Sequence, residues 1–221
     1  MLAATGAVLA VFTDNEVEEL YLTDGRGQPV GQVQLATLLS LAELRERQGL
    51  SLPVPVTATQ AIADLARAFH GQVIRTKTQK RFILEEFASM SAGAGGLILP
   101  AFDGLMALAK LLDLLASDGR SLPEILAEMP AYQRVERAVA CTWEAKGRLL
   151  RRLIEESRGQ RLELTDGLRF QDDRGWALIL PDGDEPFVRI YSEAGTMEEA
   201  DALSRFFADR LAALQQEGTR P

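Results

Sequence analysis

The sequence predicts a three-layer α/β/α domain with a mainly parallel sheet, followed by a smaller α+β domain with a mostly antiparallel sheet and two helices. In residues 1–130, strand-like and helix-like segments alternate, which is typical of a parallel sheet covered on both faces. In residues 161–194, short apolar or alternating runs are separated by tight turns such as Asp-Gly and Pro-Asp-Gly-Asp, a pattern that indicates antiparallel strands. The leucine-rich helices stop near Pro130, so we expect the two domains to be residues 1–130 and 131–221.

The first domain begins with a predicted buried strand, residues 7–12, and a second strand, residues 20–23. Leucines at helical spacing then predict a core helix over residues 33–47. Residues 52–56 form a short apolar run whose two prolines place it at a sheet edge or a strand end. Thr57 follows as the expected cap of the next helix.

The rest of this domain continues the alternation. Residues 72–76 read as a strand that leads into a helix carrying Phe82 and Phe87. After a glycine-rich turn and an apolar strand, Asp103 is the expected N-cap of a helix with a buried leucine stripe. A short helix over residues 124–129 ends the domain.

The second domain opens with a predicted strand, residues 133–141, and a helix, residues 142–157. The strands of residues 161–194 follow, and the last helix covers residues 196–216. Its start is well marked, because Thr196 and Glu199 have the spacing of a capping box. Two helices on one sheet predict an α+β arrangement.

Composition excludes several classes of partner and site. The chain has 221 residues and a formal net charge of −8, which argues against nucleic acid or an anionic membrane as a partner. With one cysteine, Cys141, and one histidine, His70, it can form neither an internal disulfide nor a soft zinc-type site. No apolar run approaches the about 18 residues of a membrane span, and acidic residues directly follow the apolar start, unlike in a signal peptide. A reducing cytoplasm is the expected location.

The loop of residues 180–186, with Arg189 and Tyr191 after it, is the most specific motif in the chain. It resembles the α-D-phosphohexomutases, the family of phosphomannomutase and phosphoglucomutase, whose last domain carries R-P-S-G-T-E-P followed by R-x-Y. In that family the loop grips the substrate phosphate. The residues that match the family pattern are Pro181, Gly183, Glu185, Pro186 and Arg189.

The donors of the family loop are replaced in this chain. Leu180, Asp182 and Asp184 stand in place of its Arg, Ser and Thr. A phosphate needs N–H and O–H donors and a bidentate cation, whereas each nearby carboxylate repels it by roughly 1 kcal/mol. We therefore expect Gly183, Glu185 and Arg189 to bind hexose phosphate weakly or not at all. The alternative is an acidic hairpin turn without a ligand.

A possible magnesium site lies near the start of the chain. Asp14, Glu16 and Glu18 fall in register with the three aspartates of the family's D-G-D-A-D-R-L, which implies Mg²⁺ as cofactor. Alternating carboxylates in a loop suit such a hard cation. However, glutamate is longer than aspartate, and Asn15 and Glu19 replace the family's Gly and Arg. A solvated acidic turn is the alternative.

Two further family positions bear on the substrate. The resemblance makes Lys77, after the strand of residues 72–76, a substrate-binding candidate; the alternative is an ordinary exposed lysine. The family's sugar-binding loop is G-E-x-S-G-H, whereas the glycine-rich segment of residues 91–96 has glycine or alanine in place of its polar groups. The loop that selects the sugar is therefore expected to be degenerate.

One branch of the family is most similar. The run of residues 141–147 and the L-P-D-x-x-E-P form of the phosphate loop resemble proteins in which a mutase-like half follows a mannose-1-phosphate guanylyltransferase. The resemblance covers nearly the whole chain, but only the family's third and fourth domains. The T-x-S-H-N loop of the phosphoserine domain is absent from this sequence.

The resemblance implies a phosphohexomutase-like C-terminal module of sugar-nucleotide and carbohydrate metabolism. We assign no catalytic residue, because mutase chemistry requires a phosphorylated serine that this chain lacks, so the module is expected not to be catalytic alone. The alternative is an enzyme subunit that completes a two-chain hexose-phosphate mutase, an isomerase that transfers phosphate intramolecularly with Mg²⁺. The expected partners are a nucleotidyltransferase or the missing mutase domains.

Overall fold

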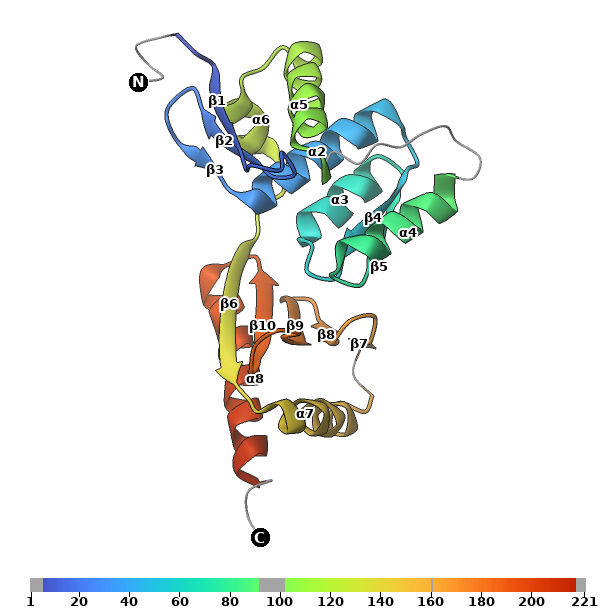
Figure 1. Ribbon diagram of the computed structural model, residues 1–221, viewed down its shortest axis with the longest axis vertical. Coiled ribbons are helices and arrows are strands. Elements are labelled where there is room, and N and C mark those ends of the chain that lie inside the picture. The colour runs from blue at the N-terminus through green and yellow to red at the C-terminus, as the bar shows by residue number, and fades with distance from the viewer. Residues whose placement is uncertain (1–5, 92–101, 160, 218–221) are drawn as a thin grey trace. The chain divides into compact units, whose positions relative to one another are not determined.

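The computed structural model describes residues 6–91, 102–159 and 161–217 (Figure 1). Contacts along the chain divide it into two compact units. The main change of unit falls between Pro130 and Ala131, and two short earlier segments belong with the second unit. The first unit comprises Met1–Pro53, Ala58–Ile74 and Leu84–Pro130, and the second comprises Val54–Thr57, Arg75–Ile83 and Ala131–Pro221.

The first unit begins with a three-stranded antiparallel sheet of β1 (Leu9–Thr13), β2 (Leu20–Asp24) and β3 (Pro29–Val30), in that order. Short turns join these strands, and short connections allow only antiparallel pairing. The prediction of a buried first strand was wrong, since Phe12 is 69% exposed. Among the strands in the described ranges, β1 is an edge strand, with β2 as its one neighbour in this sheet.

A leucine core packs beside this sheet. It joins α2 (Gln32–Glu46), α5 (Gly104–Asp118) and α6 (Leu122–Glu128). Asp103 is the N-cap of α5, as predicted, and its carboxylate accepts a hydrogen bond from the Met106 N–H at 2.9 Å. The fully or nearly fully buried residues of this cluster include Leu20, Leu22, Leu35, Leu38, Leu41, Leu111, Leu114, Leu122 and Ile125.

A strand, helix, strand, helix segment lies between α2 and α5: β4 (Ser51–Pro55), α3 (Gln60–Ala68), β5 (Gln72–Thr76) and α4 (Lys80–Ser91). β4 and β5 pair. The Gln72 N–H donates to Leu50 at one end and the Val56 N–H donates to Thr76 at the other, so the two strands run in the same direction. Thr59, not the expected Thr57, caps α3, because its Oγ1 accepts the Ala61 N–H at 3.2 Å. The α/β prediction is confirmed, although β1–β3 depart from the mainly parallel arrangement.

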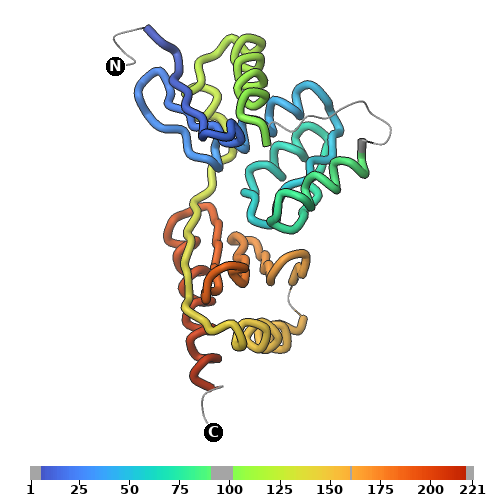
Figure 2. Tube along the Cα trace, viewed as in Figure 1, coloured from blue at the N-terminus to red at the C-terminus, as the bar shows by residue number. Residues whose placement is uncertain are grey.

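The second unit contains a five-stranded antiparallel sheet in the order β6-β10-β9-β8-β7. This confirms the predicted antiparallel domain with helices, and β6 joins its sheet beside β10. The chain path from β6 through α7 to α8 can be followed in Figure 2. The elements are β6 (Gln133–Ala140), α7 (Trp143–Glu156), β7 (Leu162–Glu163), β8 (Leu168–Gln171), β9 (Gly175–Pro181), β10 (Phe187–Ala194) and α8 (Met197–Glu217).

Both helices of this unit pack on one face of the sheet. Alternate residues of the strands point to that face, among them Ile179 and Ile190, which are fully buried. They meet Leu149 of α7 and Leu211 of α8. This packing fixes the ends of β9 and β10, and so positions the loop that joins them. Throughout the described ranges, the helices are all too short or too polar to cross a membrane.

We expect Ile190→Ala to lower the free energy of unfolding by about 2–5 kcal/mol, because it empties a fully buried site. Leu164→Ala is the control, since Leu164 is 59% exposed and its truncation should cost less than about 1 kcal/mol. Urea denaturation followed by circular dichroism measures both values. Similar losses for the two variants would contradict the described packing.

Candidate functional site

The loop between β9 and β10 is the best-defined polar site in the second unit. The two strands pair in register, with Leu180 opposite Arg189. The Asp182 N–H donates to Phe187 O at 3.0 Å, and the Phe187 N–H donates to Glu185 O at 2.8 Å. The hairpin is therefore closed at its base, and Asp182, Gly183, Asp184 and Glu185 form a compact turn.

The Asp182 carboxylate occupies the inside of this turn. Its Oδ1 accepts the N–H groups of Asp184 and Glu185, both at 2.9 Å. Its Oδ2 accepts a hydrogen bond from Arg189 Nε at 2.5 Å. Two backbone amides and a guanidinium are the kind of donors that bind an anion. We call these donors, the amides of Asp184 and Glu185 and the guanidinium of Arg189, the anion seat. In this chain the Asp182 carboxylate itself is the anion that they bind.

Arg189 is engaged by three carboxylates. Besides Asp182, it contacts Glu185 Oε2 through Nη2 at 3.0 Å and Glu136 Oε1 through Nη1 at 3.4 Å. Glu136 comes from β6, next to β10 in the sheet. The hydrogen bond that Arg189 donates to the Asp182 carboxylate is the main cause that raises the pKa of Arg189. All three guanidinium nitrogens thus have an acid partner.

The turn keeps Asp182 ionised. The Asp184 amide, and then Arg189, stabilise the charged form and lower the pKa of Asp182 to about 2. The space beside Gly183 is open, since a Cβ built there would meet nothing within 4 Å. Of the predicted substrate residues, the structure brings Glu185 and Arg189 together, with Gly183 at the tip of the same turn.

Lys146, which the sequence analysis did not identify, donates hydrogen bonds to the backbone of this turn. Its side chain comes from the start of α7 and the residue is 7% exposed. Nζ donates to the carbonyl oxygens of Asp182 and Glu185, each at 2.6 Å. It also lies 3.5 Å from the centroid of the Trp143 ring. The only sequence signal was a lysine in the run of residues 141–147.

Lys77 takes a different position. It is exposed, and its ammonium lies 4.8 Å from the centroid of the Phe82 ring. It takes no part in the hydrogen bonds described above for the β9–β10 turn. Its role in substrate binding stays a prediction.

The predicted magnesium loop is a closed turn. Asp14 Oδ1 accepts the Glu19 N–H at 3.0 Å, while Glu16 and Glu18 are exposed. The Gly104 N–H donates to Val17 O at 2.7 Å, which ties this turn to the start of α5. In the ranges that the structure describes, no three or more His, Cys, Asp or Glu residues are grouped so that they could hold a metal ion. The glycine-rich sugar loop lies largely outside those ranges.

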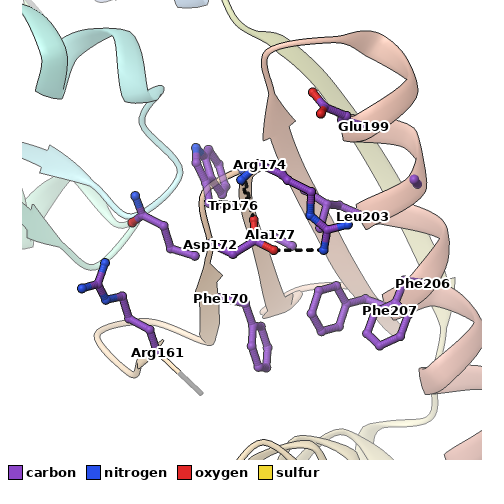
Figure 3. A pocket seen from close by; sticks show the side chains of 13 residues that line it. Arg161, Phe170, Asp172, Arg174, Trp176, Ala177, Glu199, Leu203, Phe206 and Phe207 are labelled. Atoms are coloured by element: carbon purple, nitrogen blue, oxygen red, sulfur yellow. Dashed lines mark hydrogen bonds and ion pairs between the residues drawn. The ribbon is translucent and has the colours of Figure 1, made fainter. Parts of the chain in front are cut away.

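A cavity of about 640 Å³ lies elsewhere in the second unit, beside the β8–β9 hairpin and α8 (Figure 3). Its aromatic lining residues are Phe170, Trp176, Phe206 and Phe207. At its polar side, Asp172 pairs with Arg174 at 3.1 Å. It shares no lining residue with the β9–β10 turn.

We expect the Asp182 carboxyl to titrate near pH 2, well below the ordinary value of about 3.9. Because the folded pKa is depressed, the ionised side chain stabilises the turn above about pH 4, and this contribution is lost as pH falls toward 2. Carboxyl-carbon NMR over this range measures the titration. The Asp182→Asn variant, which cannot ionise, identifies the resonance, and a midpoint near 3.9 would show that the carboxylate lies outside the turn.

Comparisons with known proteins show which family the chain resembles. Residues 33–132 match the sequence profile described as phosphoglucomutase/phosphomannomutase, alpha/beta/alpha domain III. A probable phosphoglucosamine mutase from Methanopyrus kandleri is 30% identical over an alignment that covers 93% of this chain and 48% of that protein. The chain therefore spans about half the length of the curated relatives it matches.

Solved structures agree on the fold. A phosphoglucomutase/phosphomannomutase family protein from Burkholderia thailandensis has a TM-score of 0.80 and 21% identity, covering 97% of this chain and 48% of that one. An Aspergillus fumigatus N-acetylphosphoglucosamine mutase, solved with GlcNAc-6P and magnesium, has a TM-score of 0.64 and 13% identity, covering 93% of this chain and 49% of that one. Together with the profile match, these similarities show that the chain resembles the third- and fourth-domain region of phosphoglucomutase/phosphomannomutase proteins.

Proposed function

We propose that the chain is a phosphohexomutase-type C-terminal module of cytoplasmic sugar-nucleotide and carbohydrate metabolism that is not catalytic by itself. One observation carries this proposal: the Asp182 carboxylate takes the two amides and the guanidinium nitrogen that an incoming anion would need. Its phosphate, sugar and metal loops are degenerate, and its work is structural or regulatory.

Electrostatics explain why the phosphate loop would stay empty of phosphate. A phosphate that approaches Arg189 meets Asp182, Glu185 and Glu136, which already hold the guanidinium. Each carboxylate that stays repels a dianion. Each one that leaves must give up a charge-assisted hydrogen bond, and these are about twice as strong as neutral ones. Phosphate should therefore bind this loop more weakly than a loop whose donors are open.

The enzyme alternative is a subunit of a two-chain hexose-phosphate mutase. The relatives that match the chain are mutases about twice its length, so a partner would have to supply the other half with its phosphoserine. Asp14, Glu16 and Glu18 would then hold Mg²⁺, as one solved relative contains magnesium. Arg189 would hold the substrate phosphate, and Lys77 would be a further substrate-binding residue.

Each of the two proposed functions implies a different partner chain. A chain with the missing mutase domains suits the enzyme alternative and agrees with the mutase names of the relatives. A nucleotidyltransferase suits the non-catalytic module, because the L-P-D-x-x-E-P form of the turn resembles the mutase-like half of mannose-1-phosphate guanylyltransferase fusions.

Calorimetric titration separates the two functions. We expect glucosamine-6-phosphate and mannose-1-phosphate, each with Mg²⁺, to give no heat above dilution with the natural chain. The double variant Asp182→Ser, Asp184→Thr vacates the seat and restores two hydroxyl donors, so it should bind at least about tenfold tighter, a gain of about 1.4 kcal/mol.

Asp172→Ser is the matched control for this titration. Asp172 closes the β8–β9 turn in a similar way, since its Oδ1 accepts the N–H groups of Arg174 at 2.9 Å and Gly175 at 3.2 Å. Its replacement should leave phosphate binding unchanged. Micromolar binding by the natural chain would support the enzyme alternative, and a double variant that binds no better would contradict the explanation from Asp182.

A further inference from the structure

Lys146 is a buried cation with an unusual set of partners. Its ammonium donates hydrogen bonds to the carbonyl oxygens of Asp182 and Glu185, and the ring of Trp143, one helical turn earlier in α7, lies over it. An ammonium has three donor directions. Two carbonyls and one aromatic face use all three, so the charge is fully satisfied by dipoles and a π system.

We propose that Lys146 is the positioning residue of the anion seat: it holds the β9–β10 turn in the one conformation that aims the amides of Asp184 and Glu185 at the same point. This inference rests on the proposed function only in treating that point as the seat of an anion. The group that contacts the anion is the backbone, and Lys146 acts through it.

The order of peptide groups along the turn supports this role. Lys146 fixes the carbonyl of the peptide that joins Asp182 to Gly183 and the carbonyl of the peptide that joins Glu185 to Pro186. The two peptides between them carry the N–H groups that donate to Asp182. Peptide groups are planar and rigid. The hydrogen bonds from Lys146 to the outer two therefore limit the rotation of the inner two.

The energetic cost of the lysine also points beyond stability. Burying an ammonium group is unfavourable until its partners compensate, and an apolar residue of similar volume is often as stabilising. The turn is also held at its far end by the Cys141 N–H, which donates to Pro186 O at 2.8 Å. A methionine would therefore fill the space, but it would remove the lysine donor from both carbonyls, and the Glu185 oxygen would keep only its hydrogen bond from the Phe187 N–H.

The test compares Lys146→Met with Lys146→Arg in the otherwise natural chain, and Arg151→Met, an exposed position on the same helix, is the matched control. We expect Lys146→Met to raise the pKa of Asp182 from about 2 by at least one unit, a roughly tenfold change in proton affinity. Amide hydrogen exchange at Asp184 and Glu185 should rise together with it. Lys146→Arg, which keeps charge and donors, should restore both values at least in part.

Unchanged pKa and exchange in a folded Lys146→Met variant would overturn the proposal. If that variant does not fold, Lys146→Gln serves in its place: its amide can reach one carbonyl, so the shift should be smaller but present, and no shift would again overturn the proposal. These readouts need no added ligand. Failure of the Asp182, Asp184 double variant to bind phosphate would therefore count against the proposed function and leave the role of Lys146 separately decided.

Discussion

The interaction on which the site depends is the contact of the Asp182 carboxylate with two backbone amides and Arg189. It closes the turn between β9 and β10 and aligns Arg189 with Glu185 and Glu136. The donors of this turn are of the kind that bind an anion, and here the anion is covalently part of the chain. A tethered carboxylate binds without loss of translational freedom, so a free phosphate competes with it at a disadvantage.

Much of the fold was predictable, because periodicity and turn residues are local properties of a sequence. The α/β half, the antiparallel half, the cap at Asp103 and both helices of the second unit follow from such patterns. The exposure of Phe12 in the first strand was not predictable, since an apolar strand reads the same whether it is central or at an edge. Nor does any local pattern show that Val54–Thr57 and Arg75–Ile83 join the second unit.

The site was predictable only where a linear motif carries it. Glu185 and Arg189 follow from the spacing of the turn. Asp182 was expected to repel a ligand, and the structure shows that its carboxylate accepts a hydrogen bond from Arg189. Lys146 was missed because it sits between apolar positions of α7, and its acceptors lie 36 and 39 residues further along the chain. Only the folded sheet brings them together.

A crystal structure of the natural chain, grown or soaked with a high concentration of inorganic phosphate, tests the central claim most directly. The account predicts that Asp182 keeps its hydrogen bonds to the amides of Asp184 and Glu185 and to Arg189, with no phosphate between them. A phosphate bound by Arg189 and these amides, with the Asp182 side chain turned out to solvent, would contradict it.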